Sequence, residues 1–141
     1  MTTSRDVMTK DPVCATPEDT VATVARLMKD NDIGPVPIVE GKTSKRLVGI
    51  VTDRDLALKV VAEGRDPSST QVRDVTTKDV VTCRVDEAVE DTLQAMSKNQ
   101  LRRILVVDEN DMLVGIIAQA DIATRMNEPE KTGEVVKEIS E

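Results

Sequence analysis

Thr52 and Asp55 are the residues whose types and spacing first suggest a binding site in this chain. The apolar run 47–51 before them is typical of a buried strand, and the acidic stretch 53–55 opens a segment with the apolar spacing of a helix. A hydroxyl at a strand end and a carboxylate in a first helical turn both face the unpaired backbone N–H groups of that turn. The arrangement suits a small polar ligand, and an ordinary helix cap has the same pattern.

The same pattern occurs a second time in the chain. Residues 113–122 repeat residues 47–56 with Val, Gly, Ile and Asp in register, and residues 7–39 align with residues 75–107. Self-similarity of this kind is the signature of a repeated structural unit. The chain is therefore predicted to be a tandem repeat of two similar copies.

Each copy predicts one order of elements: a short strand, a helix, a pair of strands joined by a polar turn, and a second helix. Thr16 is the predicted N-cap of the first helix, and Asp86 begins the equivalent helix of the second copy. Asn31 and Asn99 suit the left-handed backbone that ends each of these helices. The predicted core stripes are Val21, Val24, Ala25 and Met28 in the first helix, and Val89, Leu93 and Met96 in the second. The other predicted elements are short strands at 13–15 and 80–84, hairpin strands at 36–39 and 104–107, and a helix from Asp55 to about Glu63.

Two domains, a linker and a tail follow from this alignment. The predicted domains are residues 5–63 and 72–127, joined by the turn-rich linker 64–71. The linker is short, so we expect the two copies to pack together. Residues 128–141 are a charged tail, for which a frayed end and a helix docked on a partner subunit are equally good interpretations. A weak apolar stripe in this tail consists of Val135, Val136 and Ile139.

Composition excludes several classes of function. The formal net charge is −7 and Phe, Tyr and Trp are absent, which argues against binding nucleic acid through phosphate neutralisation or base stacking. The chain has no His, so a His-based catalytic group or a typical zinc site is not expected. No apolar run is long enough to cross a membrane, and residues 1–6 lack the apolar core of a signal peptide. We therefore expect a cytoplasmic protein that binds no metal and no membrane.

The repeated β-α-β-β-α order, with Gly-Ile-x-x-x-x-Asp in each copy, resembles the CBS domain, named after cystathionine β-synthase. Residues 6–11 at the start and residues 101–107 before the second hairpin support this resemblance, which covers about residues 5–127. The chain is also similar to the small stand-alone two-CBS proteins of bacteria, including the mycobacterial hypoxic-response type. The resemblance implies an α/β (α+β) fold in which the two repeats pack sheet to sheet as a pseudo-twofold CBS pair (Bateman module) with two related clefts. It further implies a homodimer.

The resemblance also implies roles for individual residues in one of these clefts. Asp55 would accept hydrogen bonds from ribose hydroxyls, and Thr52 would bond to ribose or phosphate. Arg102 and Arg103 occupy the family's basic pair, and a planar guanidinium meets phosphate oxygens two at a time. The adenine pocket would be lined by the aliphatic side chains of Ile50 and Val81.

The second cleft departs from the family pattern. Asp121 is present, but Ala118 replaces the hydroxyl residue and residues 34–35 are Gly-Pro where a basic pair is expected. Losing two charge-assisted contacts would weaken binding by about 3–6 kcal/mol. We therefore predict one competent site and one degenerate cleft per chain. The residues of this weaker site are Asp121, Val13 and Ile116.

The resemblance implies a regulatory module without catalytic residues, which binds AMP, ADP or ATP and changes shape, with S-adenosylmethionine and NAD as further candidate ligands. The regulated target would be a separate protein. The alternative is a protein–protein adaptor or dimerisation module with vestigial clefts, in which Asp55 only caps a helix. A redox or metal switch at Cys14 and Cys83 is a weaker idea, because neither lies in a CxxC motif and the repeat alignment predicts that the two thiols face opposite sides of their strands.

Overall fold

The computed structural model describes residues 1–125, so the predicted tail at 128–141 lies outside the described residues. The chain forms two compact units. One unit is Val13–Val80, and the other combines Met1–Pro12 with the described part of the chain from Val81. No helix among the described residues is long and apolar enough to span a membrane.

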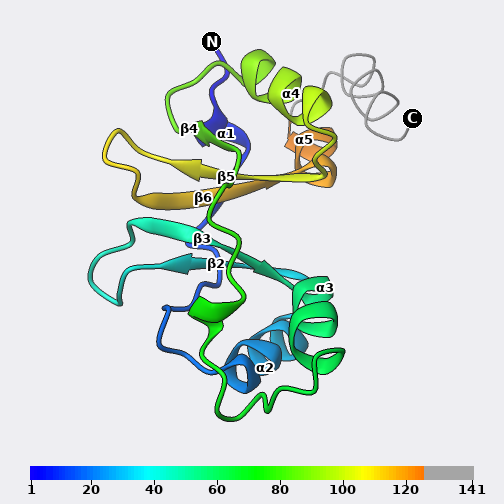
Figure 1. Ribbon diagram of the computed structural model, residues 1–141. Coiled ribbons are helices and arrows are strands. Elements are labelled where there is room, and N and C mark those ends of the chain that lie inside the picture. Colours follow the sequence, from blue (N-terminus) through cyan, green and yellow to red (C-terminus); the bar gives the residue numbers. More distant parts are fainter. Residues whose placement is uncertain (126–141) are drawn as a thin grey trace. The chain divides into compact units, whose positions relative to one another are not determined.

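The unit Val13–Val80 contains one antiparallel hairpin covered by helices. Strands β2 (Pro35–Val39) and β3 (Leu47–Thr52) pair from Pro35 with Thr52 to Val39 with Leu47, as the repeat pattern predicts. Helix α2 (Val21–Asn31) and helix α3 (Asp53–Leu56) lie on the same side of this hairpin (Figure 1). Three of the four residues of the predicted stripe, Val21, Val24 and Met28, are buried in the core of this unit, whereas Ala25 is exposed.

The predicted boundaries of the helices are wrong by a few residues. Helix α2 starts at Val21 with Thr20 as its N-cap, because Thr16 closes a separate turn with Asp19, whose backbone N–H donates to the Thr16 carbonyl at 3.0 Å. Helix α4 (Val89–Lys98) likewise starts three residues after Asp86. The helix predicted from Asp55 to Glu63 divides into α3 and a π-helical segment, η1 (Ala57–Val61). Apolar spacing over a single turn does not distinguish these two helix types.

Asn31 and Asn99 end their helices in a different way from the prediction. The left-handed residues are their successors, Asp32 and Gln100. Each asparagine side chain instead donates to the carbonyl four residues earlier, at 2.9 Å for Asn31 and 2.8 Å for Asn99. The side-chain amide thus satisfies a helix-terminal carbonyl, and the next residue makes the turn.

The second unit contains a four-stranded sheet in the order β1-β6-β5-β4. Strands β5 (Arg103–Val107) and β6 (Leu113–Ala118) form the predicted antiparallel hairpin, and β4 (Thr82–Arg84) pairs parallel with β5. Helices α1 (Ser4–Val7), α4 and α5 (Gln119–Arg125) lie on the same side of this hairpin (Figure 1). Val89, Leu93 and Met96 of α4 are buried in its core, which confirms the second predicted stripe and, with the first unit, the α/β fold class.

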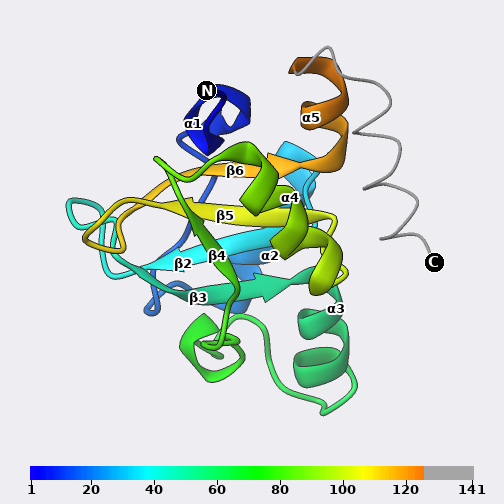
Figure 2. The same cartoon turned by 90° about the horizontal axis from the view of Figure 1, so that it is seen from above.

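The first residues of each repeat pack in the unit that carries most of the other repeat. Strand β1 (Thr9–Lys10) lies near the start of the first repeat but pairs with β6 of the second, at the edge of that sheet. Helix α1, just before β1, lies next to β6 (Figure 2). Thr77 precedes the second repeat's strand but exchanges two backbone hydrogen bonds of 2.9 Å with Ile50 of β3. The 3₁₀ helix η2 (Val72–Asp74) packs in the same unit. We call residues 5–12 and 72–80 the leading segments.

Candidate functional site

Thr52 and Asp55 lie together at the junction of β3 and α3. The Asp55 carboxylate oxygen Oδ2 accepts from the Thr52 backbone N–H at 2.9 Å and from its hydroxyl at 3.0 Å. In return the Asp55 backbone N–H donates to the Thr52 hydroxyl oxygen at 3.2 Å. The pair is therefore a reciprocal capping box at the start of α3. Thr52 and Asp55 thus cap a helix, which is the structural alternative to a binding site that the sequence pattern also allows.

The second oxygen of Asp55 keeps capacity for a ligand. Oδ1 lies 3.4 Å from the Lys59 ammonium, and the Asp55 side chain is 20% exposed. A carboxylate oxygen has two lone pairs, so one ion pair leaves Oδ1 able to accept from a hydroxyl. Lys59 was not predicted, although its position four residues after Asp55 on a helix is a readable signal. Its ammonium also donates to the Val75 carbonyl at 3.4 Å and so joins η1 to residues 72–80.

The same Thr-x-x-Asp hydrogen bond closes turns elsewhere in this chain. The backbone N–H of Thr3 donates to Asp6 Oδ2 at 2.8 Å, and that of Thr16 donates to Asp19 Oδ2 at 2.9 Å. Both distances resemble the 2.9 Å at Thr52. The box alone therefore does not identify a ligand site, and Asp19 is a matched control for Asp55.

The other residues of the predicted first site fall in two groups. Ile50 lies in the same unit as Thr52 and Asp55, is half-buried, and has both backbone groups paired with Thr77. Arg102 and Arg103 belong to the other unit, which carries β4, β5 and β6, and both side chains are exposed. Val81 is 40% exposed there, which is unusual for a valine in this chain. Joint binding of one ligand by the two groups remains a prediction.

Asp121 of the predicted weaker site has a hydroxyl neighbour that the sequence did not indicate. Ala118, at the end of β6, has no hydroxyl, but the Thr9 hydroxyl in the leading segment donates to Asp121 Oδ2 at 3.4 Å. Ile116 is half-buried on β6, where it pairs with Thr9. Val13 is half-buried in the other unit. Asp55 and Asp121 thus both accept from a threonine hydroxyl. The threonine is three residues away for Asp55 and lies in the leading segment for Asp121.

The two cysteines are both free. Cys83 is buried on β4, and burial is the main cause that raises the pKa of its thiol above the ordinary value. Its hydrogen bonds with Ser4 and Thr92 lower this pKa by less, and the nearby Glu87 carboxylate raises it further. A buried protonated thiol is a poor nucleophile. Among the described residues no group of three or more His, Cys, Asp and Glu is placed to hold a metal ion.

Both repeats match the family profile of the CBS domain, over residues 5–62 and 72–128. The CBS domain-containing protein YhcV of Bacillus subtilis (strain 168) is 36% identical over 140 residues, which cover 99% of this chain and 96% of that protein. Hypoxic response protein 1 of Mycobacterium tuberculosis (strain H37Rv) is 34% identical over 128 residues, which cover 91% of this chain and 87% of that protein.

Solved structures share the fold. A crystal structure of Hypoxic Response Protein I with two coordinated zinc ions matches 88% of this chain and 98% of that one, with a TM-score of 0.76 and 34% identity. The CBS domain pair of protein MJ0100, in complex with 5′-methylthioadenosine and S-adenosyl-L-methionine, matches 88% of this chain and 94% of that one, with a TM-score of 0.72 and 29% identity. With a profile match in each repeat and a relative alike along nearly its whole length, this chain belongs to the CBS domain family and carries two CBS domains in tandem.

Proposed function

We propose that this chain is a regulatory module that binds an adenosine nucleotide of the AMP, ADP or ATP class and signals by a change of conformation. The observation that supports this most directly is the likeness to the CBS pair of protein MJ0100, which binds two adenosine-containing ligands. S-adenosylmethionine is a further candidate on the same ground. The proposal includes a cytoplasmic homodimer that acts on a separate protein.

The residues assigned to the nucleotide are those of the predicted first site. Asp55 would receive the ribose hydroxyls on Oδ1, the oxygen that is not used by Thr52. A ribose that binds there would compete with or join the Lys59 ammonium, which makes Lys59 an added member of the proposed site. Arg102 and Arg103 would meet phosphate, and among the described residues neither of these exposed side chains forms an ion pair.

The test is isothermal titration of the full chain with AMP, ADP, ATP, NAD and S-adenosylmethionine, repeated on Asp55→Asn and Asp19→Asn. Both variants weaken the same kind of box, so both should lower the free energy of unfolding by a similar amount. Only Asp55→Asn should also weaken ligand affinity, by about tenfold or more, because a charged acceptor is lost. We expect one site per chain. Equal affinity of the two variants, two equal sites per chain, or no heat with any ligand at millimolar concentration would each contradict the proposal.

The adaptor or dimerisation module stays as a second candidate because of one apolar patch. Leu58 is 51% exposed and Val61 is 75% exposed, and both lie on η1. Exposed neighbouring aliphatic side chains are a feature of protein contact surfaces. If Leu58→Ser with Val61→Ser halves the mass measured by light scattering and leaves nucleotide affinity unchanged, the patch serves association and the two functions are separate.

A further inference from the structure

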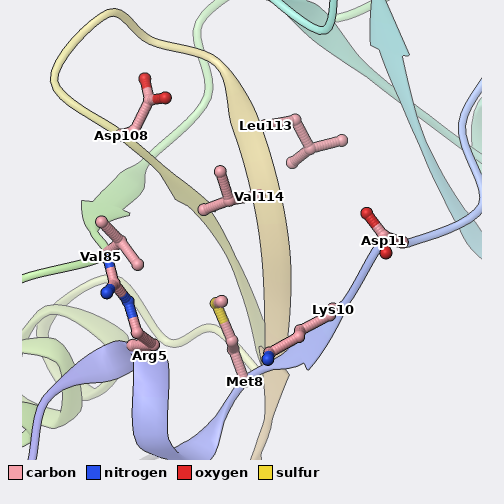
Figure 3. Close-up of a pocket in the computed structure, with 8 residues that line it drawn as sticks. All are labelled: Arg5, Met8, Lys10, Asp11, Val85, Asp108, Leu113 and Val114. Atoms are coloured by element: carbon pink, nitrogen blue, oxygen red, sulfur yellow. The ribbon is translucent and has the colours of Figure 1, made fainter.

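A pocket of about 440 Å³ opens in the unit that carries the second repeat, outside every residue assigned to the nucleotide (Figure 3). Its volume falls in the range of small-molecule sites. Elements from three parts of the chain form it: the leading segment at residues 5–11, the residue after β4, and the β5–β6 hairpin. The lining residues are Arg5, Met8, Lys10, Asp11, Val85, Asp108, Leu113 and Val114.

The floor of this pocket is apolar and held by backbone hydrogen bonds. Met8, Val85 and Leu113 are buried in the fold, and Val114 packs against the same core as Met8. The Arg5 backbone N–H donates to the Val85 carbonyl at 3.1 Å, which fixes α1 beside the end of β4. The pairing of Lys10 with Gly115 holds the other wall. The pocket is therefore part of the folded unit.

Two cations stand at one end of the pocket. Figure 3 shows Arg5 and Lys10 on either side of Met8, with Asp108 at the opposite end on the hairpin loop. Among the described residues, neither basic side chain has an ion pair or a side-chain hydrogen bond. The two cations are thus available to a ligand.

The carboxylates of the rim do not neutralise these cations. Asp108 Oδ1 accepts from the backbone N–H groups of Asn110 at 2.8 Å and Met112 at 3.0 Å, so this carboxylate closes its own loop. Asp11 is exposed, lies on left-handed backbone with a φ of 51°, and makes no ion pair within 4.0 Å of Arg5 or Lys10. The pocket consequently has a cationic end and an apolar body.

We propose that this pocket binds a small organic anion whose carboxylate, sulfonate or phosphate group meets Arg5 and Lys10 and whose apolar body lies on Met8, Val85 and Val114. Guanidinium and ammonium donors supply charge-assisted hydrogen bonds to such a group, and the apolar floor removes hydrocarbon surface from water. The pocket is a second ligand site, independent of the proposed nucleotide site, and it joins the leading segment to the second repeat.

The probe is 8-anilinonaphthalene-1-sulfonate, an aromatic sulfonate that fluoresces on apolar protein surfaces. The chain has no Phe, Tyr or Trp, so the protein adds little background fluorescence. The full chain is titrated with the probe, as are Arg5→Gln/Lys10→Gln and the matched control Arg26→Gln/Lys29→Gln. The control pair is exposed on α2 and removes the same charge. Amide shifts of labelled protein then locate the probe.

We expect the Arg5/Lys10 double variant to bind the probe about tenfold or more weakly and the control double variant to bind within about twofold of the original chain. The largest amide shifts should be those of Met8, Val85 and Val114. AMP at millimolar concentration should leave probe affinity unchanged, whether or not AMP itself binds. An equal effect of the two double variants, shifts confined to other residues, displacement by AMP, or no binding of the probe would each overturn the proposal.

Discussion

Gly49 and Gly115 occupy equivalent positions in the two hairpins, and each is covered by a leading segment. A Cβ at Gly115 would lie 2.5 Å from Met8 Sδ and 2.9 Å from the Thr9 carbonyl oxygen. A Cβ at Gly49 would lie 2.6 Å from Thr76 Cγ2 and would collide with the Thr77 carbonyl oxygen. Glycine at these positions lets another backbone approach the strand closely.

Gly49→Ala should therefore destabilise the chain by about 1–3 kcal/mol. Gly115→Ala should cost less, because part of its contact is the flexible Met8 side chain. Gly41→Ala is the control, since no atom lies within 4 Å of the added Cβ, and it should change stability by less than about 0.5 kcal/mol. Urea unfolding followed by far-ultraviolet circular dichroism measures all three. Equal stability of Gly49→Ala and Gly41→Ala would contradict the close approach.

Cys83 makes stability depend on alkaline pH. Burial raises the pKa of its thiol in the folded chain above the value in the unfolded chain. Its contribution to stability is complete below the unfolded pKa and is lost as pH rises from there toward the folded pKa, because the unfolded state then gives up the proton more readily. We expect the free energy of unfolding to fall between pH 7 and pH about 10 by more in the original chain than in Cys83→Ala. Parallel pH slopes in urea unfolding would disprove this expectation.

Helix α1 is held against α4 and β4 by a directed chain of buried hydrogen bonds. The Thr92 hydroxyl donates to Glu87 Oε2 at 3.1 Å, so the 2.7 Å contact between the Ser4 and Thr92 oxygens has Ser4 as donor. The Cys83 thiol in turn donates to the Ser4 oxygen at 3.7 Å. Ser4 and Thr92 are both 0% exposed, so removal of one hydroxyl leaves a buried partner unsatisfied.

Ser4→Ala and Thr92→Val should each lower the free energy of unfolding by about 1–3 kcal/mol. The double variant should cost less than the sum of the two, with a coupling of about 0.5 kcal/mol or more. Thr23→Val is a suitable control, because Thr23 forms a similar 3.0 Å hydroxyl contact with Thr20 but is exposed. Strict additivity of the two buried substitutions in urea unfolding would show that the hydroxyls do not act together.

The two compact units of the fold do not coincide with the two repeats of the sequence. Residues 5–62 and 72–128 match the family profile as repeats, whereas the compact units are Val13–Val80 and a unit that joins Met1–Pro12 to the chain from Val81. Each leading segment completes the hairpin of the other repeat. A single repeat cut out by its sequence boundaries therefore lacks the segment that pairs with its hairpin.

Residues 13–80 should accordingly fold as an isolated fragment more readily than residues 5–63. The first fragment keeps the pairing of Ile50 with Thr77 and the contact of Val72 with Asp19, whose backbone hydrogen bond is 2.8 Å. The second fragment loses both. Thermal circular dichroism should show a cooperative transition for residues 13–80 and a weaker or absent one for residues 5–63. The reverse order of stability would contradict this account of the two units.

Features that depend on local spacing could be predicted from the sequence. The apolar period of Val21, Val24 and Met28 predicted a buried helical face, and the duplicated Val-Gly-Ile stretch predicted a tandem repeat. The resemblance to the CBS domain is confirmed by the profile match in both repeats. The proximity of Thr52 and Asp55 was also readable, because a three-residue interval is short enough for the backbone alone to bring the two side chains together. The assignment of ligand contacts to these residues remains a prediction.

Features that depend on distant parts of the chain could be read from the fold but not from the sequence. Thr16 and Thr20 are both acceptable N-caps by residue type, and the turn with Asp19 selects Thr20. The contact of Thr9 with Asp121 and the coverage of Gly115 join segments more than a hundred residues apart. No local propensity specifies such a contact, because it is chosen by burial and backbone pairing across the whole unit. The glycine at the equivalent position of both repeats, Gly49 and Gly115, is a sequence signal that another backbone approaches the strand closely.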